Sequence, residues 1–101
     1  MSTLKHTNLH PKNLMEQIDI QLLALLEEAV QNNEYVDDEI GEQVANLHKQ
    51  WLLCNCESYS CPAHRALVQS YVTDPQIKAH YDQHVDGCAN FLKCAVEYHM
   101  V

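Results

Sequence analysis

The sequence predicts an all-α fold of about five helices, arranged as a single domain. Of 101 residues, 47% are hydrophobic, and only two glycines and three prolines interrupt them, as is typical of a helical globular chain. Apolar residues recur at three- and four-residue spacing in five segments, and no segment alternates apolar and polar residues as a strand would. A chain of this length buries one core. We therefore expect one helical domain over residues 11–101, preceded by a flexible lead over residues 1–10.

Two long helices are predicted in the N-terminal half. Pro11 suits a first helical turn, and residues 31–33 end the first pattern with a Gln-Asn-Asn run that favours a turn. The apolar stripe between them consists of Leu14, Ile18, Leu22, Leu25, Leu26 and Ala29. The second helix is expected to begin at the acidic cluster 37–39, which suits the positive end of a helix dipole, and to reach Leu53. Its stripe consists of Ile40, Val44, Leu47 and Trp51.

Residues 54–61 are predicted to form a loop, because they are rich in small polar groups and lack an apolar stripe. Pro62 restarts a helix, with Ser60 or Cys61 as its cap. The residues expected on the inner face of this third helix are His64, Leu67, Val68 and Tyr71.

The last two helices are predicted from a break and a glycine. Thr73 and Gln76 form a capping-box pattern, and Pro75 is tolerated in a first turn, so a fourth helix begins here. It is expected to end at Gly87, because glycine readily adopts the left-handed C-terminal cap. The inner residues of this helix are expected to be Ile77, Tyr81 and Val85. A fifth helix is expected over residues 88–98, and its inner residues are Phe91, Leu92, Ala95 and Tyr98.

The charge of the chain argues against nucleic acid and anionic membranes as partners. Six Lys and Arg residues face fourteen Asp and Glu residues, so the net charge is −8 with neutral histidines. Nucleic-acid binders use clusters of Lys and Arg to replace counterions on phosphates, and the sequence holds no such cluster. No apolar run approaches the ~20 residues that span a bilayer. The polar N-terminus does not resemble a signal peptide, so a cytoplasmic location is predicted.

The cysteines favour free thiols or metal ligands over a disulfide framework, because their number, five, is odd. Four soft donors lie within eleven residues of the predicted loop: Cys54, Cys56, Cys61 and His64. Four such ligands suit a structural zinc ion, although the spacing is not that of a standard zinc knuckle. Cysteines near a helix junction also serve as small apolar fillers, so both interpretations stay open.

A second group of donors, His80, His84 and Cys88, recurs at four-residue spacing along the predicted fourth helix. Two histidines spaced in this way can hold a metal ion on a helix. No glutamate lies between them to act as a base, and Gly87 is expected to end the helix before Cys88. The sequence therefore favours a solvated polar face here.

Catalysis by a cysteine is weakly indicated. Cys61 at a helix start, with His64 one turn later, has two of the features that activate a thiol. The chain shows no orienting third group and no glycine-bearing turn that would form an oxyanion pocket. We therefore predict a protein that is not an enzyme and needs no cofactor.

Most aromatic residues lie in the C-terminal half of the chain. They are Trp51, Tyr59, Tyr71, Tyr81, Phe91 and Tyr98. In a small helical domain such side chains usually fill the core. Alternatively, some of them line a pocket for an apolar ligand that is rich in rings, and the sequence leaves both interpretations open.

Short motifs follow one another in a specific order over roughly residues 35–100. They are His48-x2-Trp51, Tyr59, His64-Arg65-Ala66-Leu67, Tyr71-Val72-x-Asp74-Pro75, Tyr81, Gly87 and Phe91-Leu92. In this order and spacing the sequence resembles the TipAS antibiotic-recognition domain. That domain is the ligand-binding half of certain MerR-like transcription activators that sense thiopeptide and related peptide antibiotics.

The resemblance implies a globin-like helical arrangement whose cleft binds a bulky, aromatic, peptide-like antibiotic of the thiopeptide or albicidin kind. The positions that it places in the wall or core of this cleft are His48, Trp51, Tyr59, His64, Leu67, Tyr71, Tyr81 and Phe91. Some members capture a thiopeptide covalently through a cysteine. In this chain Tyr59 stands at that position, and Cys56 and Cys61 flank it as candidates for covalent capture.

The resemblance also implies a role in sensing or sequestering a drug. The sequence shows no DNA-binding segment, so we expect a free-standing ligand-binding domain. Two other hypotheses remain. One is a metal- or redox-responsive module that uses the Cys54, Cys56, Cys61 and His64 cluster, and the other is a helical interaction domain that dimerises through an apolar face. The oligomeric state is left open.

Overall fold

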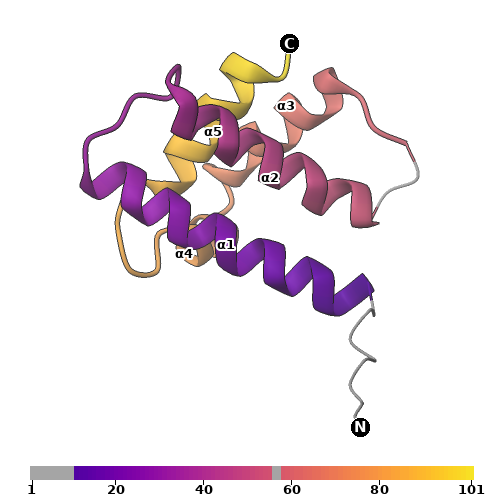
Figure 1. Ribbon diagram of the computed structural model, residues 1–101, viewed down its shortest axis with the longest axis horizontal. Helices are drawn as coiled ribbons and strands as arrows, with labels where there is room; N and C mark the ends of the chain where they lie inside the picture. The colour runs from indigo at the N-terminus through magenta and orange to yellow at the C-terminus, as the bar shows by residue number, and fades with distance from the viewer. Residues whose placement is uncertain (1–10, 56–57) are drawn as a thin grey trace, which may run out of the picture.

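The computed structural model describes residues 11–55 and 58–101, so the predicted lead at residues 1–10 and the candidate Cys56 lie outside the described residues. Within these ranges the chain forms five helices and no strand, which confirms the all-α prediction. The helices are α1 (Pro11–Gln31), α2 (Glu39–Asn55), α3 (Cys61–Tyr71), α4 (Pro75–Tyr81) and α5 (Cys88–His99). In Figure 1, α1 and α2 run side by side in opposite directions, and α5 lies behind α2.

The core is centred on α5, which packs against each of the other helices. Five α5 residues are completely buried, namely Cys88, Ala89, Leu92, Ala95 and Val96. Long apolar side chains from α1 and small ones from α2 meet them, and small residues let the helix backbones approach closely. The completely buried partners are Leu22, Leu26, Ala29, Val44 and Ala45. In the described part of the chain, no helix is both long and apolar enough to cross a membrane.

The predicted helix boundaries at Asn33 and Ser60 are confirmed. Asn33 adopts a left-handed conformation with φ of 56°, and the Glu34 N–H donates to the carbonyl of Ala29 at 2.9 Å, which ends α1. At the start of α3 the Ser60 hydroxyl accepts a hydrogen bond from the Ala63 N–H at 3.2 Å. These local signals act within one turn, so the sequence contains them in full.

The start of α4 differs from the capping box predicted at Thr73. The cap is Asp74, whose carboxylate accepts from the backbone N–H groups of Gln76 and Ile77 at 3.0 and 3.3 Å. The Thr73 hydroxyl instead donates to the carbonyl of Ser70 at the end of α3. Aspartate is a more stabilising N-cap than threonine here, because its negative charge also interacts with the positive end of the helix dipole.

The end of α4 was predicted at Gly87, and this prediction is wrong, because α4 stops at Tyr81. The side chain of Asp82 turns to the next helix and accepts a hydrogen bond from the Ala89 N–H at 2.9 Å. Lys78 donates to the other carboxylate oxygen at 2.8 Å. Gly87, with φ of 102°, therefore caps the N-terminus of α5 and not the C-terminus of α4. The residues of this contact, Asp82 and Ala89, are seven positions apart, farther than the three- and four-residue spacing that predicts a helix.

The prediction that Tyr98 points inward is also wrong, because 57% of this side chain is exposed. The inner face of α5 continues through Val96 to Met100, and Tyr98 lies on the opposite side of the helix. Its neighbour His99 donates through Nε2 to the carbonyl of Val36 at 2.7 Å. This hydrogen bond attaches the end of α5 to the connection between α1 and α2.

Gly41 provides a test of the close approach between α2 and the connection that precedes it. A Cβ at this buried position would lie 1.8 Å from the carbonyl oxygen of Val36, so the backbone would have to move. In an ordinary helix interior, Gly→Ala stabilises by about 1 kcal/mol. We predict that Gly41→Ala instead lowers the free energy of unfolding by at least about 2 kcal/mol, measured by urea denaturation. The exposed Asn46→Ala in the same helix is the control, and a stabilised Gly41→Ala variant would contradict the close approach.

Candidate functional site

A buried network of two histidines and two tyrosines joins α2 to α3. His48 Nδ1 and His64 Nε2 share a hydrogen bond of 2.8 Å. The other nitrogen of His48 pairs with the Tyr71 hydroxyl at 3.2 Å, and the other nitrogen of His64 pairs with the Tyr59 hydroxyl at 2.7 Å. His48 is completely buried and His64 is 2% exposed. We call these four side chains the histidine–tyrosine network.

The four groups of this network are uncharged at neutral pH. Burial, followed by the nearby His64, lowers the pKa of His48 from 6.5 to about 3. Burial and the charge of Lys49 lower the pKa of His64 from 6.5 to about 4. Burial is also the main cause that raises the pKa of Tyr59 and of Tyr71 to about 12. Charge is therefore excluded from this part of the interior.

The network can run in two directions, because a neutral histidine has one donor nitrogen and one acceptor nitrogen. In one direction Tyr59 donates to His64, His64 to His48, and His48 to Tyr71. The Tyr71 proton is then free for another partner. In the reverse direction Tyr71 donates and Tyr59 accepts. Both directions satisfy every nitrogen, so Tyr71 can act as a donor or as an acceptor toward its surroundings.

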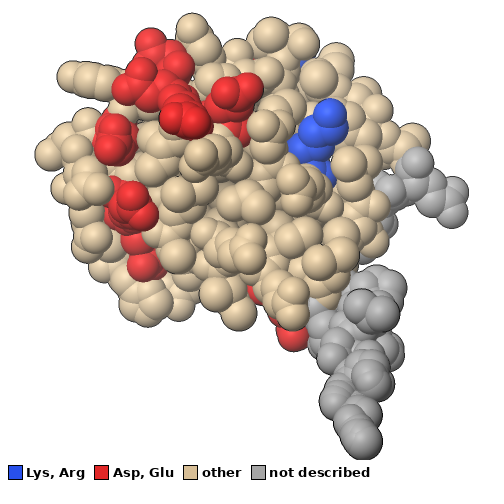
Figure 2. Space-filling view, viewed as in Figure 1, with Lys and Arg blue, Asp and Glu red and all other residues tan. Residues whose placement is uncertain are grey.

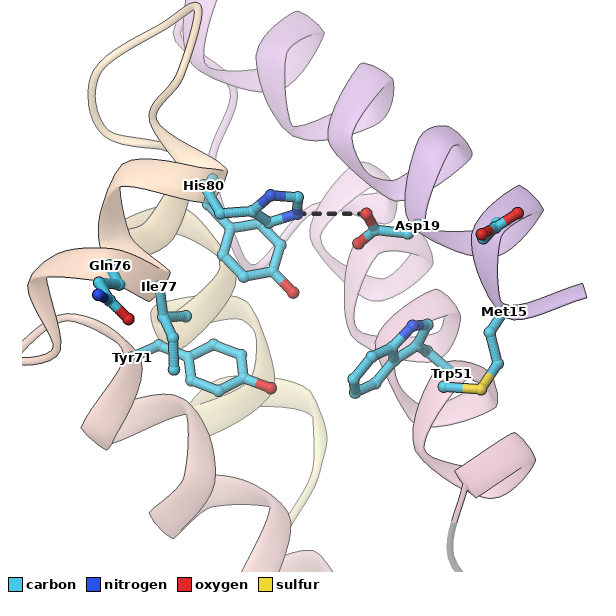
Figure 3. A pocket seen from close by; sticks show the side chains of 9 residues that line it. Met15, Asp19, Trp51, Tyr71, Gln76, Ile77 and His80 are labelled. Atoms are coloured by element: carbon cyan, nitrogen blue, oxygen red, sulfur yellow. Dashed lines mark hydrogen bonds and ion pairs between the residues drawn. The ribbon is translucent and has the colours of Figure 1, made fainter. Parts of the chain in front are cut away.

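Tyr71 also lines a cavity of about 500 Å³, which we call the main cavity. The cavity lies between α1, α2, α3 and α4, and Figure 3 shows side chains entering it from these helices. Its lining consists of Met15, Glu16, Asp19, Trp51, Tyr71, Gln76, Ile77, His80 and Tyr81. The Trp51 ring stacks on His48 at a centroid distance of 5.8 Å, and the rings of Tyr71 and Tyr81 stack at 5.6 Å. Aromatic rings held in this way form rigid walls.

Polar contacts join the two sides of the main cavity. His80 of α4 donates through Nε2 to the Asp19 carboxylate of α1 at 3.2 Å, shown as the dashed line in Figure 3. Farther along α1, a carboxylate oxygen of Glu27 lies 2.8 Å from His84 Nδ1. The histidine of each pair is exposed and the carboxylate is partly exposed, so each pair contributes little to stability. They can therefore separate at low cost when a ligand enters.

A smaller cavity of about 210 Å³, the second cavity, lies at the other end of the histidine–tyrosine network. Its lining consists of Leu52, Ser58, Tyr59, Ser60, Ala63, His64 and Leu67. The Lys49 ammonium lies 4.9 Å above the centre of the Tyr59 ring. The network thus connects a tyrosine of one cavity to a tyrosine of the other.

The residues predicted for the site divide between these features. Trp51, Tyr71 and Tyr81 line the main cavity. Tyr59, His64 and Leu67 line the second cavity. His48 connects the two groups, and Phe91 packs in the core on α5 and lines neither cavity.

Sequence reasoning missed the contribution of α1 to the main cavity and most of the contribution of α4. The residues concerned are Met15, Glu16, Asp19, Gln76, Ile77 and His80. Glu16 and Asp19 lie three positions apart on α1 and so share one helix face, which was the available signal. Nothing in the local pattern relates that face to α4, more than fifty residues later.

The residues proposed as metal ligands are not brought together. Within the described ranges, no three His, Cys, Asp or Glu side chains lie close enough to hold a metal ion. Both ring nitrogens of His64 are already hydrogen-bonded, and Cys56 lies outside those ranges. His80 and His84 are exposed, as the favoured interpretation of a solvated polar face predicts. They do not share one helix with Cys88, because α4 ends at Tyr81 and Cys88 is buried at the start of α5.

Acidic side chains gather on the surface at the end where α1 meets α2, as Figure 2 shows. The exposed residues of this region are Glu28, Glu34, Asp37, Asp38, Glu39 and Glu42. Several of them lie at the N-terminus of α2, where negative charge is favourable. On this face acidic groups outnumber basic ones, as the composition predicts.

A model of the TipAS antibiotic-recognition domain matches residues 4–99. The chain belongs to the TipAS family. The match covers almost the whole sequence and includes α1, whereas the motif resemblance covered roughly residues 35–100. The helix that supplies Glu16 and Asp19 is therefore part of the TipAS domain. No curated protein and no solved structure matches the sequence.

The neutral histidines of the TipAS domain predict a loss of stability in mild acid. Each takes up a proton near pH 6.5 when unfolded but only near pH 3 or 4 when folded. Between pH 6.5 and 5 the unfolded state binds more protons, so the free energy of unfolding falls as the pH falls. The limiting slope is about 1.4 kcal/mol per pH unit for each histidine.

Urea denaturation at several pH values measures this slope. His64→Gln is expected to remove about half of the contribution of the network, and the exposed His84→Gln is expected to leave that contribution in place. Asp82 and Glu97, whose pKa values are lowered, add their own loss only below about pH 4.5. Equal slopes for wild type and His64→Gln would show that His64 is not held neutral.

Proposed function

We propose that the main cavity binds a bulky, aromatic, peptide-like antibiotic of the thiopeptide or albicidin kind. The observation that carries this proposal is an apolar cavity with three aromatic walls in a TipAS antibiotic-recognition domain. The walls are Trp51, Tyr71 and Tyr81, each held by a ring contact to a neighbour. Rigid aromatic walls with a few polar groups suit ligands that are rich in rings.

The size of the cavity supports partial enclosure of such a ligand. A volume of about 500 Å³ lies within the range of roughly 300–1,000 Å³ that holds drug-sized molecules. A larger antibiotic would place one ring-bearing segment inside and the remainder over the edge between α1 and α4. The weak Asp19–His80 pair spans that edge, and its separation would widen the entrance.

The other predicted residues support the site indirectly. His48 and His64 hold Tyr71 in position, Tyr59 and Leu67 form the second cavity, and Phe91 fills the core. In this proposal the protein binds its ligand without chemical conversion and needs no cofactor. Binding of this kind serves a drug sensor or a protein that sequesters the drug.

Trp51 is the single tryptophan and lines the cavity, so it reports on binding. We predict that a thiopeptide or an albicidin-like compound raises the melting temperature and changes the tryptophan fluorescence. Trp51→Ala should lower the affinity at least about tenfold, measured by calorimetry, because it removes a buried aromatic contact.

Tyr98→Ala is the matched control, because this aromatic side chain is exposed and lines neither cavity. It should bind with the affinity of the wild type. The proposal fails if no compound in a panel of multi-ring peptide antibiotics stabilises the protein, or if Trp51→Ala binds as well as the wild type.

Reversible binding is the expected mode. Cys61 lines neither cavity, and the other candidate for covalent capture, Cys56, lies outside the described residues. A thiol captures an antibiotic by adding its S–H across an electron-poor double bond. We predict that intact-mass analysis after incubation with such a thiopeptide shows the unmodified protein. An adduct that disappears in Cys56→Ser or Cys61→Ser would contradict this prediction and identify the capturing residue.

A further inference from the structure

Tyr81 lies in the wall of the main cavity, and its side chain is buried. Tyr81 is 4% exposed, and within the described ranges its hydroxyl has no hydrogen-bond partner. Leaving a buried hydroxyl without a partner costs about 1–3 kcal/mol, and such groups usually find one. A bound ligand that reaches this hydroxyl would recover that cost.

Two further polar groups face the same region. The Tyr71 ring stacks on the Tyr81 ring, with an angle of 20° between their planes. Asp19 lines the same cavity as both tyrosines, and its charge contributes, after burial, to the raised pKa of each. Figure 3 shows Asp19 and Tyr71 directed toward the same space from α1 and α3. We call Tyr81, Tyr71 and Asp19 the polar end of the cavity.

The donors and acceptors at the polar end restrict the ligand. The Asp19 carboxylate only accepts hydrogen bonds, and one of its oxygens already holds His80. The Tyr81 hydroxyl can donate one hydrogen bond. No Lys or Arg lines the cavity, and Glu16 adds a second carboxylate. An anionic group would therefore meet two negative charges with no basic partner except His80.

We propose that the polar end binds an uncharged carboxamide of the ligand, whose N–H donates to Asp19 and whose carbonyl accepts from Tyr81. The inference rests on the proposed function and specifies the group that this site recognises. The adjacent rings of the ligand then lie against Trp51. A carboxamide stays uncharged at neutral pH and offers both a donor and an acceptor in one plane.

Tyr71 can assist either half of the carboxamide, because the histidine–tyrosine network can reverse. When His48 donates to Tyr71, the Tyr71 hydroxyl can donate to the ligand carbonyl. When Tyr71 donates to His48, its oxygen can accept from the ligand N–H. Tyr71 is thus a binding residue whose role as donor or acceptor follows the tautomer of His48.

A matched pair of small probes tests the proposal on the whole protein. N-acetyltryptophanamide and N-acetyltryptophan share one aromatic ring and differ in a carboxamide or a carboxylate. Titrations followed by two-dimensional amide NMR should show the amide binding at least about tenfold more tightly than the acid. Equal binding of the two probes, or binding of neither, would overturn the proposal.

Two variants assign the preference to named atoms. Tyr81→Phe should weaken binding of the amide about tenfold, because it removes the donor to the carbonyl. Asp19→Asn should improve binding of the acid and reduce the preference, because it removes a negative charge. An unchanged preference in both variants would overturn the assignment.

Stability measurements separate recognition from folding. Tyr81→Phe should melt at or above the wild-type temperature, because the lost hydroxyl has no partner in the described part of the protein. Tyr71→Phe should melt lower, because it leaves a nitrogen of buried His48 unpaired. A large drop in the melting temperature of Tyr81→Phe would show that its hydroxyl is already satisfied in the protein, which contradicts the inference.

The probe experiment and the antibiotic panel fail independently. If the panel stabilises the protein but the probes show no preference for the amide, the main cavity binds its ligand through other groups and the inference is wrong. If the probes show the preference while no antibiotic binds, the proposed function is wrong and the polar end still recognises a carboxamide.

Discussion

The hydrogen bond between His48 and His64 is the contact on which the rest of the site depends. It is buried between α2 and α3, two helices that otherwise meet mainly through their common packing against α5. Because a buried polar atom without a partner is costly, the hydrogen bond fixes the position of one helix relative to the other. Tyr71 is the last residue of α3, and its ring forms a wall of the main cavity.

Burial of the same two histidines also keeps this part of the interior uncharged. Two neutral histidines leave the buried network without charge, and the carboxylates of Glu16 and Asp19 line the α1 side of the main cavity. The cavity is therefore apolar on most of its surface and acceptor-rich at one end. Such a surface suits a neutral, ring-bearing ligand better than an anion, which agrees with the acidic composition of the whole chain.

The five helices could be predicted because the sequence signals that specify a helix are local. The apolar stripes from Leu22 to Ala29 and from Val44 to Leu52, and the Ser60 cap, lie within a few turns of the chain. The predictions that failed depend on distant partners. Asp82 ends α4 by bonding to Ala89, and Tyr98 is exposed because the inner face of α5 is set by the packing of the other helices.

The candidate site could be predicted only in part, because some of its residues meet partners that are distant in the sequence. The motif order indicated the TipAS family and the aromatic residues Trp51, Tyr71 and Tyr81, all of which line the main cavity. The contribution of α1 was not predictable, since Asp19 meets His80 across 61 positions of sequence. A cavity is the space that remains between the side chains of several packed helices, so no single segment specifies it.

By itself, the sequence determined the five helices, most of their boundaries, the acidic charge and the family, because periodicity, caps and motif order are properties of neighbouring residues. Only the tertiary structure decided which aromatic residues face a cavity, that His48 and His64 are neutral partners, and that the Tyr81 hydroxyl has none in the described part of the chain. Those properties arise where α1, α2, α3 and α4 meet. They depend on distances between segments, which a linear pattern does not contain.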